Sequence, residues 1–102
     1  MAEHVSFFRA KALPGKRQAV LEQFEKWDRE QKAKAKGFLR TILVAKNDDP
    51  DEFTGATYWD TTENYFANAE RPEQDAWYWE LRASLAEDPV WFDGTLVRET
   101  AA

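Results

Sequence analysis

The order of strand-like and helix-like patterns constrains the fold more than any other feature of the sequence. Period-two alternation, interrupted by turn residues, predicts four strands at His4–Ala12, Phe38–Lys46, Phe53–Trp59 and Val90–Thr100. Helical spacing of apolar residues predicts a first helix at Lys16–Ala35 and a second in two pieces, Thr62–Ala69 and Pro72–Ala86. The second helix divides at Pro72 because proline is tolerated in the first turn of a helix but not in its interior.

The resulting β-α-β-β-α-β order predicts an α+β, ferredoxin-like fold, with both helices on one face of an antiparallel four-stranded sheet. The 102 residues are expected to form one domain, 1–102. The uncovered face then carries several of the apolar side chains Phe38, Ile42, Val44, Phe53, Trp59, Trp91 and Val97. Such a face predicts a partner, and a second copy packed sheet to sheet with two-fold symmetry is the simplest one.

The junction between the third strand and the second helix, Phe53 to Phe66, is expected to form the wall of a small-molecule pocket. Asp60 is expected to cap the helix, with Glu63 bonding back to the amide of the cap. Trp59 ends the strand and Tyr65 follows in the helix, so both are predicted to border the pocket. A core aromatic pair is the alternative interpretation of these two rings.

Composition and charge argue against several classes of function. The net charge of −5, with both signs spread along the chain, argues against a nucleic-acid surface, which needs clustered Lys and Arg. The chain has no cysteine, so disulfides and thiolate metal sites are excluded. No signal peptide or membrane-spanning run is evident, so a soluble cytoplasmic protein that does not bind membranes is expected.

Two polar features are expected to be solvent-exposed rather than functional. The acidic run Asn47–Asp51 lacks the glycine and distal glutamate of a calcium loop, so a solvated hairpin loop is expected. His4 is the chain's one histidine and begins the first strand, where a solvated side chain is expected. Acid–base chemistry in a pocket is the alternative for this imidazole, and no Ser-His-Asp set can be assembled around it.

Six short motifs, taken in order, resemble the antibiotic biosynthesis monooxygenase domain of the dimeric α/β-barrel superfamily. They are Pro14-Gly15-Lys16 ahead of Phe24 and Trp27, Gly37-Phe38-Leu39, Asp48-Asp49-Pro50 with Phe53, Tyr58-Trp59-Asp60, Pro72-Glu73, and Trp91-Phe92-Asp93-Gly94. The resemblance covers nearly the whole chain. It implies a homodimer whose two sheets form a barrel, with a pocket in each subunit between sheet and helices.

The resemblance also implies a chemistry. Some members oxidise aromatic polyketides or quinols with molecular oxygen and no metal or flavin, whereas others degrade haem through an axial histidine of the second helix. Residues 62–86 contain no histidine, so the cofactor-free oxygenases are the better match and no cofactor or metal is expected. Their pocket tryptophan and tyrosine correspond to Trp59 and Tyr65. Their strand asparagine falls at Gly55, and Arg82 is the nearest candidate for their helix arginine.

The predicted function is therefore a monooxygenase acting on a small phenolic, quinol or polyketide-like substrate. Trp59 would stack on the substrate, Tyr65 would hydrogen-bond its oxygen, and Arg40 would stabilise its anion. The further substrate-binding candidates are Arg9, Phe7, Phe38, Tyr78 and Arg82. A surface or dimer ion pair is the alternative for the arginines of the first two strands. The alternative function is a catalytically silent dimeric module that binds an apolar ligand.

Overall fold

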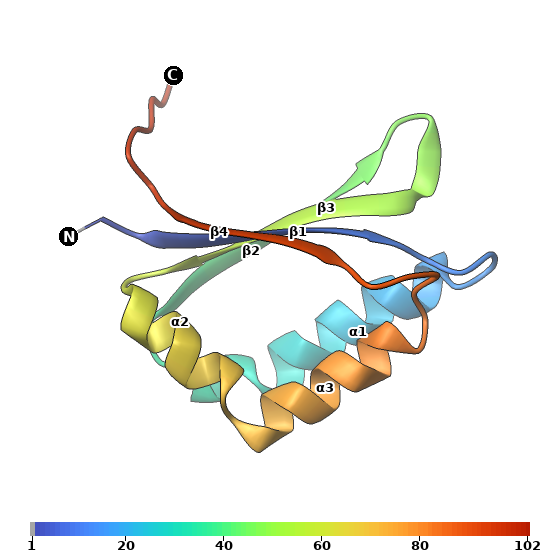
Figure 1. Cartoon of the computed structure of the whole chain (residues 1–102), viewed down its shortest axis with the longest axis horizontal. Coiled ribbons are helices and arrows are strands. Elements are labelled where there is room, and N and C mark those ends of the chain that lie inside the picture. Colours follow the sequence, from blue (N-terminus) through green and yellow to red (C-terminus); the bar gives the residue numbers. More distant parts are fainter. Residues whose placement is uncertain (1) are drawn as a thin grey trace.

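The computed structural model describes residues 2–102 as two layers, an antiparallel sheet covered on one face by helices (Figure 1). The strands are β1 (His4–Lys11), β2 (Phe38–Lys46), β3 (Asp49–Trp59) and β4 (Val90–Thr95). The helices are α1 (Arg17–Glu30), α2 (Thr62–Ala69) and α3 (Pro72–Arg82), with a 3₁₀ turn, η1 (Lys32–Lys34), after the first. The strand order β2-β3-β1-β4, antiparallel throughout, confirms the predicted ferredoxin-like fold.

The register of β1 decides which side chains face the helices. Phe8 lies opposite Gly55 of β3 and Trp91 of β4, and His4 lies opposite Trp59. Residues opposite each other in an antiparallel ladder share a face. The residues on the helix side of β1 and β3 are therefore His4, Ser6, Phe8, Ala10, Phe53, Gly55, Thr57 and Trp59.

The other face of the sheet is open in the single chain. Ile42 and Val44 of β2 and Phe7 of β1 project there and are about half exposed, and Phe92 of β4 projects there and is about two-thirds exposed. Phe53 and Trp59, which were candidates for this face, are buried on the helix side. The open face therefore keeps an apolar character, but it carries only part of the expected set.

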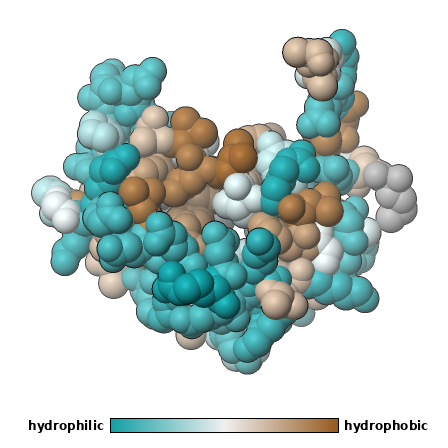
Figure 2. Space-filling view, turned by 180° about the vertical axis from the view of Figure 1, so that it is seen from behind, coloured by the Kyte–Doolittle hydropathy of each residue, from teal (hydrophilic) through white to brown (hydrophobic). Residues whose placement is uncertain are grey.

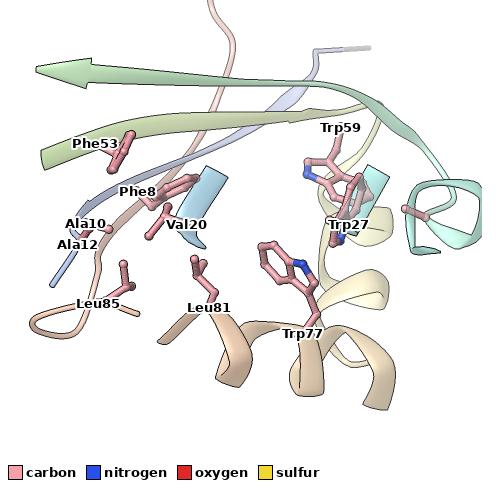
Figure 3. Packing of buried hydrophobic residues seen from close by; sticks show 11 residues of the cluster. Phe8, Ala10, Ala12, Val20, Trp27, Phe53, Trp59, Trp77, Leu81 and Leu85 are labelled. Atoms are coloured by element: carbon pink, nitrogen blue, oxygen red, sulfur yellow. The ribbon is translucent and has the colours of Figure 1, made fainter. Parts of the chain in front are cut away.

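Reciprocal hydrogen bonds join α1 to α3 beneath the sheet. The Trp77 indole donates to the Gln23 carbonyl at 2.8 Å, and the Gln23 side-chain amide donates to the Trp77 carbonyl at 3.0 Å. The Trp27 indole donates to the Gln74 side chain at 2.7 Å. Figure 3 shows Trp77 rising from its helix toward the sheet and Trp59 projecting from the sheet toward the helices. The rings thus pack between the two layers while their polar N–H groups stay bonded.

Several element boundaries differ from the prediction. The first helix ends at Glu30 and continues as the 3₁₀ turn before Gly37, whose φ of +80° closes the connection in the left-handed region. The third strand begins at Asp49, because a two-residue turn suffices between β2 and β3. A register shift after Ala45 accommodates Pro50 within the strand.

The ends of the second helix and of the last strand also differ. The helical part of α3 ends at Arg82, four residues before the predicted end. β4 ends at Thr95, because the chain then leaves the ladder, and Val97 is almost fully exposed. None of the helices within residues 2–102 has the length and apolar character that crossing a membrane requires.

The cap of α2 is Thr61 rather than Asp60. The Thr61 hydroxyl accepts from the Asn64 amide at 3.1 Å, whereas Asp60 instead accepts from the Asn64 side chain at 2.8 Å. The Asp60 amide donates to the Gly37 carbonyl at 2.9 Å. Asp60 therefore ties the helix to the loop before β2, and the predicted capping box with Glu63 is wrong.

Candidate functional site

A cavity of about 790 Å³ lies between the sheet and the helices. Side chains from all four strands or their flanks and from all three helices contribute to its wall, and most of them are aromatic or aliphatic. Figure 2 shows hydrophobic side chains gathered around a hollow in the middle of the molecule, with hydrophilic side chains around it. A volume of this size suits an aromatic ligand of two to four rings, since small-molecule pockets span about 300–1,000 Å³.

Trp59 and Tyr65 both border the cavity, as predicted from the junction that carries them. Their rings meet edge to face, with centroids 5.8 Å apart and planes at 71°. The Trp59 indole N–H donates to the Thr57 hydroxyl at 3.0 Å, so its polar group is already satisfied. The ring of Trp59 also contacts Phe38 edge to face at 5.4 Å. These contacts hold the indole in one orientation at the cavity wall.

The Tyr65 hydroxyl is the centre of a small polar group at the same wall. The Ser6 hydroxyl donates to it at 3.1 Å, and both residues line the cavity. Burial raises the pKa of the Tyr65 phenol and the charge of Asp93 adds to this, whereas the hydrogen bond from Ser6 acts in the opposite direction. The phenol therefore stays protonated at neutral pH and can donate a hydrogen bond.

His4 is buried, which corrects the prediction of a solvated side chain. Only 4% of its surface is exposed, because α2 packs over the start of β1. Its ring stacks on Tyr65 with centroids 4.4 Å apart and planes at 24°. Nδ1 lies 3.2 Å from the Thr62 hydroxyl, and Nε2 lies 3.7 Å from an oxygen of Asp93. The imidazole therefore sits directly behind the cavity wall.

Three of the other predicted site residues contribute to the wall: Phe38, Tyr78 and Arg40. The Arg40 guanidinium itself points to the other face of the sheet. There it stacks over Tyr58 at 3.9 Å and pairs with Glu3 and Glu99 at 3.5 and 3.6 Å. Only the rest of Arg40 borders the cavity, so its charge is directed elsewhere.

The remaining predicted site residues lie away from the cavity. Phe7 and Arg9 alternate with Ser6 and Phe8 along β1 and so fall on the open face of the sheet. Arg82 pairs with Asp88 at 2.8 Å and donates to the Leu85 carbonyl at 3.0 Å. The structure therefore groups the predicted aromatic residues at the cavity but does not bring any of the three predicted guanidinium groups there.

Several polar wall residues were missed by the sequence reasoning, among them Ser6 and Asn68. Ser6 shares its strand face with Phe8, and this alternation was sufficient to place it toward the helices. Asn68 follows Tyr65 by three residues, which places both on one side of α2. Arg71 donates to the Asn68 side-chain oxygen at 3.0 Å, so the amide NH₂ is the group that can donate to a ligand.

The packing of Phe8 explains the glycine at position 55. A Cβ atom built on Gly55 would lie 2.4 Å from the tip of the Phe8 ring and 3.0 Å from the Ile42 carbonyl oxygen. The Phe8 ring is itself stacked on Phe24, with centroids 5.7 Å apart and planes at 9°. An asparagine side chain at position 55 would occupy the space that this ring fills.

Within residues 2–102, no group of three or more His, Asp or Glu side chains is placed to hold a metal ion.

The sequence matches the family model described as antibiotic biosynthesis monooxygenase over residues 4–78. The chain belongs to this family. The matched region runs from the start of β1 into α3 and so includes Ser6, Trp59 and Tyr65 of the cavity wall. A search of the curated proteins finds no match.

Solved structures agree with the family assignment in fold. SnoaB of Streptomyces nogalater, a cofactor-independent oxygenase, superposes with a TM-score of 0.73 at 18% identity, covering 98% of this chain and 97% of its own. A Nitrosomonas europaea protein that bears the family's name superposes with a TM-score of 0.81 at 20% identity, covering 97% of this chain and 94% of its own. At these identities the likeness shows a shared fold.

Proposed function

We propose that the protein is a cofactor-independent monooxygenase that oxidises a small phenolic or quinol-type aromatic substrate in this cavity. The observation that carries the proposal is the pairing of an aromatic-lined cavity of about 790 Å³ with the Ser6–Tyr65 hydroxyl pair in its wall. Membership of the monooxygenase family and the fold shared with a cofactor-independent oxygenase support it.

The proposed reaction balances without an external reductant. A naphthol or phenol loses its hydroxyl proton, and the resulting anion gives electrons to molecular oxygen. One oxygen atom becomes the new carbonyl of a quinone and the other leaves as water, so the substrate supplies all four electrons. The protein has to bind the ring, assist loss of the proton, and keep bulk water from the anion.

Binding the ring and assisting loss of the proton both have candidate residues. Trp59, with its N–H already bonded to Thr57, presents a fixed ring against which an aromatic substrate can stack. Tyr65 and Ser6 provide hydroxyl groups for the substrate oxygen. Asn68, whose amide oxygen is held by Arg71, provides a second donor on the same helix. Neutral donors of this kind stabilise an oxyanion without a fixed positive charge.

The proposal is tested by oxygen uptake with 1,5-dihydroxynaphthalene, corrected for autoxidation without protein. We expect Tyr65→Phe and Trp59→Ala to reduce the catalysed rate at least about tenfold, because each removes a contact to the reacting ring or its oxygen. Tyr58→Phe and Trp79→Phe are matched controls, because neither ring lines the cavity, and should keep the wild-type rate. Equal rates in all four variants and the wild type would contradict the proposal.

The proposed reaction uses neither metal nor flavin. Uptake should therefore be unchanged after exhaustive dialysis against a chelator, and the purified protein should show no flavin absorbance. Loss of activity on chelation, restored by a divalent metal, would contradict this part of the proposal.

We further propose that the protein works as a homodimer through the open face of the sheet. Exposed apolar side chains gather there, and the most prominent are Phe7, Ile42, Val44 and Phe92, each at least 40% exposed. Phe7 and Arg9 would then serve assembly rather than substrate binding. Sedimentation should show a dimer at micromolar concentration and a monomer for Phe92→Glu. A monomeric wild-type protein would contradict the dimer.

A silent binding module remains the alternative, and the observation that favours it is Gly55. The position that carries an asparagine in the resembling oxygenases has no side chain, and Phe8 fills the space beside it. Such a module would be stabilised by aromatic ligands, with a rise in melting temperature, and would consume no oxygen.

A further inference from the structure

We infer that His4 and Asp93 form the proton-accepting end of a relay that begins in the cavity with Ser6 and Tyr65. The inference rests on the proposed function, because it assigns a route for the proton that the aromatic substrate must lose. It concerns groups outside the cavity lining, since neither His4 nor Asp93 contributes to the wall.

The four side chains follow one another from the cavity outward. Ser6 and Tyr65 line the cavity, and their hydroxyl oxygens are 3.1 Å apart. An oxygen of Asp93 is 3.7 Å from Nε2 of His4, and the His4 ring stacks on Tyr65 with centroids 4.4 Å apart, so the carboxylate lies on the side of Tyr65 away from the cavity. Hydroxyl groups both donate and accept, so each can pass a proton onward while keeping one of its own.

The burial of His4 leaves one ring nitrogen ready to accept. The tautomer with a proton on Nδ1 donates to the Thr62 hydroxyl at 3.2 Å. Nε2 then carries a lone pair, is buried, and has no hydrogen-bond partner within residues 2–102. A buried polar atom without a partner costs free energy, so its retention calls for an explanation. A role in accepting a proton would explain why Nε2 is left without a partner, because an imidazolium at His4 and the Asp93 carboxylate would attract each other.

The proton transfer is balanced. The substrate O–H bond breaks as its proton passes to Ser6, Ser6 passes its own proton to Tyr65, and Tyr65 passes its own to Asp93. From there the proton reaches Nε2 of His4. The net change is an anionic substrate and a protonated His4–Asp93 pair, with both hydroxyl groups restored. The Asp93 side chain is 41% exposed, which gives the proton a later exit to solvent.

The surroundings of His4 identify the groups that can influence its charge. β4 contributes Asp93 and α2 contributes Tyr65, and these are the titratable side chains seen to face the ring. α2 also contributes Phe66, whose ring lies 6.1 Å away, and β3 contributes Trp59 as the neighbour in register. Because Phe66 and Trp59 carry no charge, substitutions of His4 or Asp93 test the His4–Asp93 pair directly.

The experiment uses 4-nitrophenol as a probe, because its electron-poor ring occupies the site without being oxidised. Absorbance reports the phenolate of the bound probe across pH 5 to 9. Proton NMR of the His4 ring reports its protonation, and the ring signals are assigned directly because the chain has one histidine. In the wild type, phenolate formation and His4 protonation should rise together on binding at a pH where the free probe is neutral.

His4→Phe keeps a ring stacked on Tyr65 but cannot accept a proton. It should shift the ionisation of the bound probe upward by about one pH unit or more, since a cation near the phenolate is lost. Asp93→Asn, at an exposed position, should reduce the fraction of His4 that becomes protonated. Phe66→Leu changes the packing around His4 but no proton carrier, and should behave as the wild type.

The outcomes separate the relay from the proposed function. The relay would be overturned if the bound probe formed phenolate equally in the wild type and in His4→Phe. It would also be overturned if phenolate formed while His4 stayed neutral, or if the bound probe never ionised. Coupled ionisation in a protein that consumes no oxygen with 1,5-dihydroxynaphthalene would support the relay while the oxygenase proposal fails. A probe that does not bind at all would overturn the relay, because the relay requires an aromatic hydroxyl in the cavity, whereas oxygen uptake with 1,5-dihydroxynaphthalene decides the proposed function separately.

Discussion

Substituting Gly55 by alanine should destabilise the protein through the ring of Phe8. The new Cβ would lie 2.4 Å from the ring tip, so the ring must move about 1 Å to restore ordinary van der Waals contact. Phe24 is stacked on the face of the ring and restricts this movement. Overpacking of this kind costs about 1–3 kcal/mol, and we expect the free energy of unfolding to fall by that amount in urea titrations followed by tryptophan fluorescence.

A double-mutant cycle isolates this contact. Phe8→Ala alone should cost about 3 kcal/mol, near the lower end for a buried phenylalanine because the ring borders the cavity. In that background the new Cβ still lies 3.0 Å from the Ile42 carbonyl oxygen, while alanine loses less backbone entropy than glycine in a strand. The second substitution should then be close to neutral. Equal losses from Gly55→Ala in both backgrounds would refute the argument that Phe8 requires the glycine.

Two further predictions concern α2 and its tyrosine. Thr61→Ala removes the side-chain cap and should lower the free energy of unfolding by about 1 kcal/mol, measured by urea unfolding; an equal or larger loss for Asp60→Ala would contradict the assignment of the cap. The pKa of Tyr65 is raised above its ordinary value of 10.0, so the unfolded chain releases this proton first as the pH rises. The contribution of Tyr65 to the free energy of unfolding should therefore be fully present below about pH 10 and decline above it. The decline in stability should be smaller in Tyr65→Phe but not abolished, because burial also raises the pKa of Tyr78; an unchanged decline would show that Tyr65 is not the group responsible.

Local patterns were sufficient to predict the layers of this fold. Alternation along the first strand placed Ser6, Phe8 and Ala10 toward the helices, and all three are buried there. The position of Trp59 and Tyr65 at a strand–helix junction likewise predicted that both would border a cavity. These features depend on residues close together in sequence, where periodicity carries the information.

Long-range packing decided what could not be predicted. His4 was expected in solvent because it begins a strand, yet its burial depends on α2 and β4, about 60 and 90 residues later. Asp60 and Thr61 both suit a helix cap, and the contact of the Asp60 amide with Gly37 helps explain why the threonine takes that role. The guanidinium of Arg40 was directed outward by Glu3 and Glu99, which its own strand pattern does not reveal.

The most direct test of the proposed function is the fate of isotopically labelled oxygen. The protein is incubated with 1,5-dihydroxynaphthalene under ¹⁸O₂, and the quinone product is examined by mass spectrometry. Monooxygenation predicts one ¹⁸O atom in each quinone molecule formed by the wild type, and little enzyme-dependent product from Tyr65→Phe. Product formed without label, or no product above the protein-free rate, would contradict the assignment of oxygenase activity to this cavity.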